Sequence, residues 1–177
     1  MSKATLAAGC FWCTESIFQA LQGVRHVQSG YIGGHSSHPD YRSVCSGQTG
    51  HAEAVEIDFD EQVISFSQLL QVFFATHDPT TLNRQGHDVG SQYRSAIFCH
   101  DAEQQRIASD YIVTLNQQQI FPAPIVTTLE AASQFYPAED YHQRYFELHG
   151  HEAYCQAVIL PKQMKMRRQF AQWLKSS

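Results

Sequence analysis

The chain has 177 residues, of which 43% are hydrophobic and 16% are charged, and its formal net charge is −5 at pH 7. This length and balance predict a single globular domain over residues 1–177. The acidic balance argues against nucleic-acid binding. The apolar runs are far too short to span a bilayer, and the N-terminus lacks the apolar stretch of a secretory signal. Both features predict a cytoplasmic protein that does not bind membranes.

The first half of the chain alternates strand and helix patterns. Strands are expected at residues 4–8, 24–32, 54–60 and 95–99, and helices at residues 14–22 and 66–76. Residues 54–60 alternate apolar and polar side chains, as a strand with one wet face does, whereas residues 66–76 repeat apolar side chains at helical spacing. The order strand, helix, strand, strand, helix, strand predicts an α+β fold with a two-layer ferredoxin-like core (βαββαβ).

The rest of the chain is expected to extend that core. Helices are predicted at residues 101–118, 138–149 and 161–175, and a strand at residues 125–129. Two long polar loops, 33–51 and 77–93, lie within the core region, and long loops in compact domains are usually functional or disordered. The first loop holds too much chemistry for a linker, and no interdomain linker is found.

Five cysteines and ten histidines are the chemically notable residues. In a reducing compartment such cysteines are catalytic, redox-active or simply buried, rather than members of a disulfide framework. Cys45 and Cys99, in or beside predicted strands, are expected to be inert. The histidines are scattered and show no metal-binding spacing, so we expect neither a metal nor another cofactor.

The stretch Gly9–Glu15 reads Gly-Cys-Phe-Trp-Cys-Thr-Glu and joins the first strand to the first helix. A thiol at Cys10 would lie near unpaired backbone N–H groups and the positive end of the helix dipole, which favour the reactive thiolate. Glu15 would oppose this, and Gly9 would allow a sharp turn or a close approach. The alternative is that Cys10 is a small buried hydrophobic residue.

Polar and aromatic residues in the segments at the strand ends are expected to meet at one edge of the fold. The predicted cluster comprises Cys10, Phe11, Trp12, Tyr41, Glu53, Asp88 and Tyr93. Burial of Glu53 would raise its pKa and allow it to donate a proton near neutral pH. The alternatives are that Glu53 is a surface carboxylate, that the aromatic residues are packing residues, and that Asp88 merely forms a turn.

Several long motifs in register resemble the A-type peptide methionine sulfoxide reductases. They are Gly9–Trp12, Gly30–Gly34, Tyr41–Glu53, the 77–95 segment ending Gly90–Ser95, and Ala138–Gln143. The resemblance runs from about residue 5 to about residue 161, which makes it far more specific than one short pattern. It implies a ferredoxin-like core and reduction of the S epimer of methionine sulfoxide, free or in proteins, within protein repair under oxidative stress.

The resemblance also implies roles for individual residues. Cys10 would attack the sulfoxide sulfur and become a sulfenic acid, while Glu53 protonates the oxygen. Tyr41 and Tyr93 would assist Glu53 through their hydroxyl groups, and Asp88 would support that polar network. Phe11 and Trp12 would form an apolar pocket for the S-methyl group.

Regeneration would need a resolving thiol and an external reductant. The sequence offers two candidates: Cys13, within a C-x-x-C motif with Cys10, and Cys155, in a C-terminal position that resembles one used in the family. Cys155 would need a mobile tail to reach Cys10, so Cys13 is slightly favoured. Thioredoxin or a similar dithiol is the expected partner, and a monomer is expected.

Three other hypotheses remain open at this point. A general thiol–disulfide oxidoreductase using Cys10 and Cys13 explains the C-x-x-C motif but gives no role to Glu53. A metal-binding module built on histidines and cysteines is a second alternative. A cysteine hydrolase pairing Cys10 with His51 or His87 is a third, and it lacks a family-specific signature.

Overall fold

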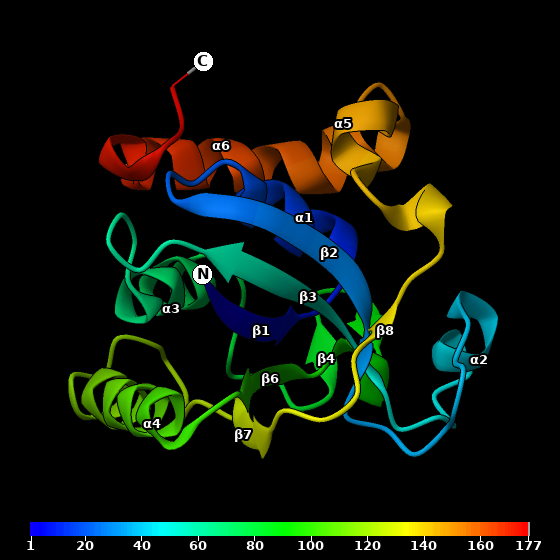
Figure 1. Ribbon diagram of the computed structural model, residues 1–177, viewed down its shortest axis with the longest axis horizontal. Coiled ribbons are helices and arrows are strands. Elements are labelled where there is room, and N and C mark those ends of the chain that lie inside the picture. Colours follow the sequence, from blue (N-terminus) through cyan, green and yellow to red (C-terminus); the bar gives the residue numbers. More distant parts are fainter. Residues whose placement is uncertain (177) are drawn as a thin grey trace.

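The computed structural model describes residues 1–176 as a mixed α+β protein built on a six-stranded sheet (Figure 1). Ser177, the last residue of the predicted domain, lies outside the described residues. The strands are β1 (Ser2–Ala8), β2 (Val24–Ile32), β3 (Ala52–Phe59), β6 (Ser95–Cys99), β7 (Thr128–Ala131) and β8 (Tyr136–Pro137), with a separate hairpin of β4 (Arg84–Gln85) and β5 (Asp88–Val89). The helices are α1 (Phe11–Gln19), α2 (Tyr41–Cys45), α3 (Phe66–Ala75), α4 (Ala102–Gln117), α5 (Tyr145–His149) and α6 (Leu160–Gln169).

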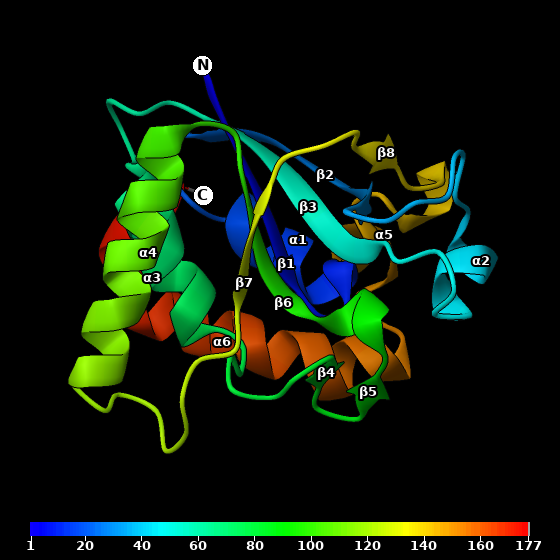
Figure 2. The ribbon, with the colours of Figure 1, turned by 90° about the horizontal axis from the view of Figure 1, so that it is seen from below.

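The strands of the large sheet follow the order β7-β6-β1-β3-β2-β8. Every neighbouring pair is antiparallel except β6 and β7, which are parallel. Helices α3 and α4 lie at one end of the sheet, and α2, α5 and β8 lie at the other (Figures 1 and 2). No helix within residues 1–176 has the length and apolar character needed to cross a membrane.

The main core lies between the sheet and the helices. Leu6 of β1 and Val55 and Ile57 of β3 are fully buried there with Phe18 of α1 and Phe73 of α3. Each such side chain stabilises the fold by roughly 2 kcal/mol. Because side chains alternate along a strand, Glu53 points to the same face as Val55 and Ile57.

The opposite face of the sheet has a smaller apolar cluster. Ala7, Ala54 and Phe98 form its centre, and Phe135, in the segment that leads to β8, packs against it. Towards the other end of β3 this face becomes polar, where Lys3 binds Glu56 and Asp58 at 3.1 and 2.9 Å. The predicted alternation of residues 54–60 therefore describes this strand correctly.

Several predicted boundaries are wrong. The helix expected over 14–22 begins at Phe11, so Cys10 is its N-cap residue. The loop expected over 33–51 contains α2, and the loop over 77–93 contains the β4–β5 hairpin and a 3₁₀ turn at Ser91–Tyr93. The helix expected over 161–175 follows a π-helical turn at Cys155–Ile159 and ends at Gln169.

The largest error concerns residues 138–149, which do not form one helix. A 3₁₀ turn at Asp140–His142 and the short α5 are separated by Arg144, whose φ of 55° lies in the left-handed region. The Gln143 side chain binds the edge of β2 instead, accepting from the Ser29 N–H and donating to the Ser29 carbonyl, both at 2.9 Å. These long-range bonds replace the local helical ones.

Candidate active site

Cys10 lies at the turn between β1 and α1, where the chain changes direction at Gly9. The φ of Gly9 is +90°, and a Cβ atom there would lie 2.7 Å from Cβ and Cγ of Gln85. A side chain at this position would therefore be both strained and too close to the β4–β5 hairpin. As predicted, the glycine serves a sharp turn and a close approach, and together these place the partly exposed Cys10 thiol at the start of α1.

The electrostatic environment of Cys10 differs from the expected one. Contact with the Cys13 thiol, followed by burial, raises the pKa of Cys10 well above its usual range. The Trp12 backbone N–H and the Tyr154 hydroxyl act in the opposite direction. The expectation that the junction of strand and helix favours a thiolate at Cys10 is therefore wrong for this structure.

Glu53 reaches this turn from β3 and is 1% exposed. Its carboxyl group accepts a hydrogen bond of 3.2 Å from the Phe11 N–H, one of the first backbone donors of α1. Burial, and secondarily the proximity of Cys10, raise the pKa of Glu53 well above the usual value. The carboxyl group thus points inward, as expected, and its surroundings favour the protonated form over the carboxylate.

The two predicted tyrosines come from different segments and approach Glu53 together. Tyr41 begins α2, and Tyr93 ends the 3₁₀ turn before β6. Burial is the main cause that raises the pKa of both hydroxyl groups, and Glu53 contributes to each shift. Both therefore remain hydrogen-bond donors at neutral pH. Asp88, in β5, is among the charges that raise the pKa of Glu53.

Cys45 was expected in or beside a strand, but it lies in α2 and is partly exposed. Burial raises the pKa of its thiol, while the side chains of Tyr41 and Tyr93 act in the opposite direction. It therefore borders the predicted cluster, whereas Cys99 is buried in β6 as expected.

Phe11 and Trp12 have different environments. Phe11 is 1% exposed and belongs to the main core, with ring centroids 5.7 Å from Tyr31 and 6.5 Å from Tyr41. Trp12 is half-buried and is stacked on Tyr145, with ring centroids 3.8 Å apart and an interplanar angle of 6°. The half-buried Trp12 ring consequently provides the accessible apolar surface, called the wall below, and the buried Phe11 ring packs in the core behind it.

Sequence reasoning missed three residues that contact this wall. His142, Tyr145 and Tyr154 come from the C-terminal part of the chain and surround the Trp12 ring. The motif Ala138–Gln143 contains His142, but the resemblance implies no role for this residue. Their proximity to Trp12 depends on packing between residues about 130 positions apart, which leaves no local signal.

The two candidate resolving cysteines lie together beneath Trp12. Cys13 is 5% and Cys155 is 0% exposed, and both belong to a small cluster with Ile159. All five cysteines are free thiols. The chain thus brings three thiols, those of Cys10, Cys13 and Cys155, to one region, and the Cys13 thiol is the main cause of the raised pKa of Cys10.

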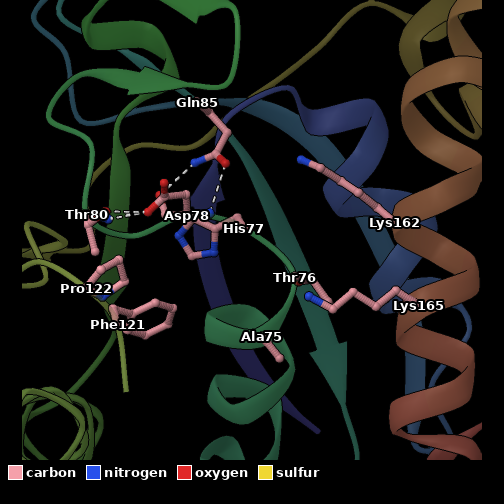
Figure 3. A pocket seen from close by; sticks show the side chains of 10 residues that line it. All are labelled: Ala75, Thr76, His77, Asp78, Thr80, Gln85, Phe121, Pro122, Lys162 and Lys165. Atoms are coloured by element: carbon pink, nitrogen blue, oxygen red, sulfur yellow. Dashed lines mark hydrogen bonds between the residues drawn. The ribbon is translucent and has the colours of Figure 1, made fainter. Parts of the chain in front are cut away.

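A separate cavity of about 350 Å³ lies behind the β4–β5 hairpin (Figure 3). His77, Gln85, Lys162 and Lys165 are among the residues that line it, and the described lining includes no predicted site residue. Both ring nitrogens of His77 are already used, by the Phe73 carbonyl at 2.6 Å and the Ser95 hydroxyl at 2.8 Å. The predicted chemistry is therefore located at the Cys10 turn and not in this cavity.

The residues at the Cys10 turn can carry out one kind of chemistry together. The Cys10 thiol lies near the buried Glu53 carboxyl group, the hydroxyls of Tyr41 and Tyr93 lie close to that carboxyl group, and the Trp12 ring follows Cys10 in the chain. Within residues 1–176, no three histidine, cysteine or acidic side chains are grouped so that they could hold a metal ion. The arrangement suits attack by sulfur on a group whose oxygen must accept a proton.

Comparisons with known proteins agree with this geometry. A family model described as peptide methionine sulfoxide reductase matches residues 2–174. The chain is 57% identical to peptide methionine sulfoxide reductase MsrA of Chromobacterium violaceum, over 99% of this chain and 100% of that protein.

Solved structures of Mxr1 from Saccharomyces cerevisiae are also similar. Its reduced form superposes with a TM-score of 0.78 at 34% identity, covering 87% of this chain and 88% of that one. Mxr1 in complex with Trx2 gives a TM-score of 0.53 at 25% identity, covering 81% and 84%.

Proposed function

The chain belongs to the peptide methionine sulfoxide reductase family and reduces methionine sulfoxide, and from this premise we propose that Cys10, Glu53, Tyr41, Tyr93 and Asp88 form its catalytic site. The observation that carries the proposal is the buried Glu53 carboxyl group, which the Phe11 N–H holds beside the Cys10 turn and whose pKa burial raises. A sulfoxide becomes a good electrophile only when its oxygen is protonated, so the acid has to face the nucleophile.

The proposed first step transfers an oxygen atom between two sulfur atoms. Cys10 attacks the sulfoxide sulfur, and Glu53 gives a proton to the oxygen, while the hydroxyls of Tyr41 and Tyr93 donate hydrogen bonds to it. The S–O bond of the substrate and the transient bond between the two sulfur atoms then break as the hydroxyl group moves to the Cys10 sulfur, and the thiol proton of Cys10 replaces the proton that Glu53 gave. Methionine leaves as the reduced product, and Cys10 carries the oxygen as a sulfenic acid.

We place the S-methyl group against Trp12, with Phe11 behind it. A small apolar pocket selects a methyl group and fixes which epimer presents its sulfur to Cys10. The proposed substrate is therefore the S epimer, either free or within proteins. Asp88 supports the network from β5.

Regeneration is proposed to begin at Cys13. The Cys13 thiol is the group that most strongly shifts the pKa of Cys10, and Cys155 lies in the same small buried cluster as Cys13. Attack by Cys13 on the sulfenic acid forms a disulfide and releases water. Cys155 can then exchange with that disulfide. Thioredoxin or a similar dithiol reduces the disulfide that results, a role for which the Mxr1–Trx2 complex gives precedent.

We further propose that residues 1–177 form one catalytic domain, monomeric and cytoplasmic, with a ferredoxin-like core that binds neither nucleic acid nor membranes. The order β6-β1-β3-β2, with α1 after β1 and α3 after β3, supports such a core. The net charge of −5 is consistent with the absence of a polyanionic partner.

The S and R epimers of a dabsylated methionine sulfoxide, supplied separately with a dithiol, test the proposed function. We expect turnover of the S epimer alone. The competing function, a general thiol–disulfide oxidoreductase using Cys10 and Cys13, would turn over neither epimer but would reduce model disulfides. Equal turnover of both epimers would contradict the proposed pocket.

A further inference from the structure

The Trp12 indole is hydrogen-bonded to a buried histidine. The Nε1–H of Trp12 donates to Nδ1 of His142 at 3.0 Å, and His142 is 1% exposed. An indole nitrogen can only donate, so Nδ1 must be unprotonated and the proton of the neutral ring must be on Nε2. Burial lowers the pKa of His142, which maintains this neutral form, although Glu139 acts in the opposite direction.

The segment that carries His142 is fixed on both sides. Glu139 accepts a hydrogen bond of 2.8 Å from the Tyr31 hydroxyl and another of 2.9 Å from the Tyr41 N–H. Gln143 accepts from the Ser29 N–H and donates to the Ser29 carbonyl. The 3₁₀ turn between these two anchors therefore has little freedom, and His142 lies within it.

The histidine ring in turn lies among the aromatic residues of the site. Its centroid is 5.1 Å from that of Phe11 and 4.4 Å from that of Tyr41. Stacking on Tyr145 restrains the plane of Trp12 but allows the indole to slide within that plane. The bond to His142 is directional and removes this remaining freedom.

We propose that His142 is a positioning residue: through Nδ1 it fixes the Trp12 indole as the wall of the S-methyl pocket, and so sets the preference for a methyl over a larger group on the sulfoxide sulfur. This inference rests on the proposed function, because it assumes that Trp12 borders the substrate. His142 takes no part in proton transfer to the sulfoxide and acts only through Trp12.

Asparagine and leucine provide a matched pair of substitutions at position 142. They have nearly the same shape, but only asparagine places an acceptor close to the position of Nδ1. The measurement is the ratio of kcat/KM for methionine S-sulfoxide to that for ethionine S-sulfoxide, with kcat and KM determined separately. We expect His142→Asn to keep the ratio within about twofold and His142→Leu to lower it about fivefold, as loss of one hydrogen bond would.

The same pair in a Trp12→Phe background shows whether His142 acts through the indole. Phenylalanine has no N–H to donate, so the Asn and Leu variants should become indistinguishable there. Equal ratios for His142→Asn and His142→Leu with Trp12 intact would overturn the inference, as would a difference that persists in the Trp12→Phe background. If Trp12→Phe itself leaves the ratio unchanged, the pocket assignment of the proposed function fails instead.

A measurement on the unsubstituted protein keeps the inference testable if the His142 variants do not fold. Nitrogen-15 NMR of the histidine rings distinguishes the two neutral tautomers. We expect His142 to carry its proton on Nε2 and the Trp12 indole N–H to exchange slowly with solvent. A proton on Nδ1 would exclude the bond and overturn the inference.

Discussion

At the scale of single residues, the proposed reaction depends on a carboxyl group that stays protonated. The Glu53→Gln substitution keeps an acceptor for the Phe11 N–H but removes the proton that the sulfoxide oxygen needs. We expect sulfoxide reduction to slow by about a hundredfold or more, as for loss of a general acid, while Cys10 still reacts with iodoacetamide. Glu56→Gln, on the same strand but on the opposite face, is the control and should leave the rate unchanged. An undiminished rate in Glu53→Gln would remove Glu53 as the acid.

The raised pKa of Glu53 also predicts a direction for the pH dependence. As the pH rises through that pKa, the proton is lost and the rate of sulfoxide reduction should fall in the wild-type protein. Single-turnover rates measured from pH 6 to pH 10 test this. A rate that rises steadily over the whole range would indicate that ionisation of Cys10, rather than protonation of Glu53, limits the reaction.

Gly9 allows the turn between β1 and α1 to pack closely against the β4–β5 hairpin. Gly9→Ala would place a Cβ atom 2.7 Å from the Gln85 side chain at a φ of +90°. Gly86 is a matched control, because its φ is also positive, +60°, but nothing lies within 4 Å of an added Cβ. We expect Gly86→Ala to cost about 1 kcal/mol of stability, and Gly9→Ala to cost more and to abolish activity by moving Cys10. Denaturant unfolding and turnover of the two variants make the comparison, and equal losses would contradict it.

At the scale of elements, Glu15 couples α1 to its neighbours. Its carboxylate accepts from the Ser29 hydroxyl at 2.9 Å, and burial raises its pKa from 4.5 to about 7. Between these values the folded chain holds a proton that the unfolded chain has lost, so the free energy of unfolding falls as the pH rises through this window. The loss amounts to about 3 kcal/mol and is complete above roughly pH 8.

Replacing Glu15 by glutamine tests this linkage. Glu15→Gln should remove most of the decline in stability between pH 5 and pH 8, because an amide has no proton to lose. Glu61→Gln, at an exposed position, should leave the decline intact. Urea unfolding at several pH values measures both, and parallel profiles for wild type and Glu15→Gln would refute the prediction.

The sequence predicts some elements well because their signals are local. The alternation of β3 and the apolar face of α3 survive in the structure, since both patterns describe burial against the main core. Residues 138–149 show the opposite case. Glu139 and Gln143 bind residues about a hundred positions away, and those bonds override a helix-like composition.

The candidate site was predictable to a similar degree. The motifs located Cys10, Glu53, Tyr41 and Tyr93, and the structure gathers them at one turn. The contacts of His142, Tyr145 and Tyr154 with Trp12 were not predictable, because they arise only when the C-terminal segment packs over α1.

At the scale of the whole molecule, the C-terminal segment completes a site that the N-terminal segment begins. It places Cys155 in the same buried cluster as Cys13, so no long excursion of the tail is needed for these two residues to meet.

With thioredoxin as reductant, Cys13→Ser should stall after about one turnover per chain. Cys155→Ser should retain the first disulfide, between Cys10 and Cys13. Mass spectrometry of the stalled proteins identifies which bond has formed, and continuous cycling of both variants would mean that the sulfenic acid is reduced from outside.

The most direct test of the central claim is a count of methionine formed without any reductant. In the Cys13→Ser/Cys155→Ser double variant, methionine S-sulfoxide should yield one methionine per chain, with a sulfenic acid on Cys10 that dimedone traps. Adding Glu53→Gln should slow this burst without changing its final size. A burst that persists after Cys10→Ser, or that shows the same rate with and without Glu53, would contradict the account.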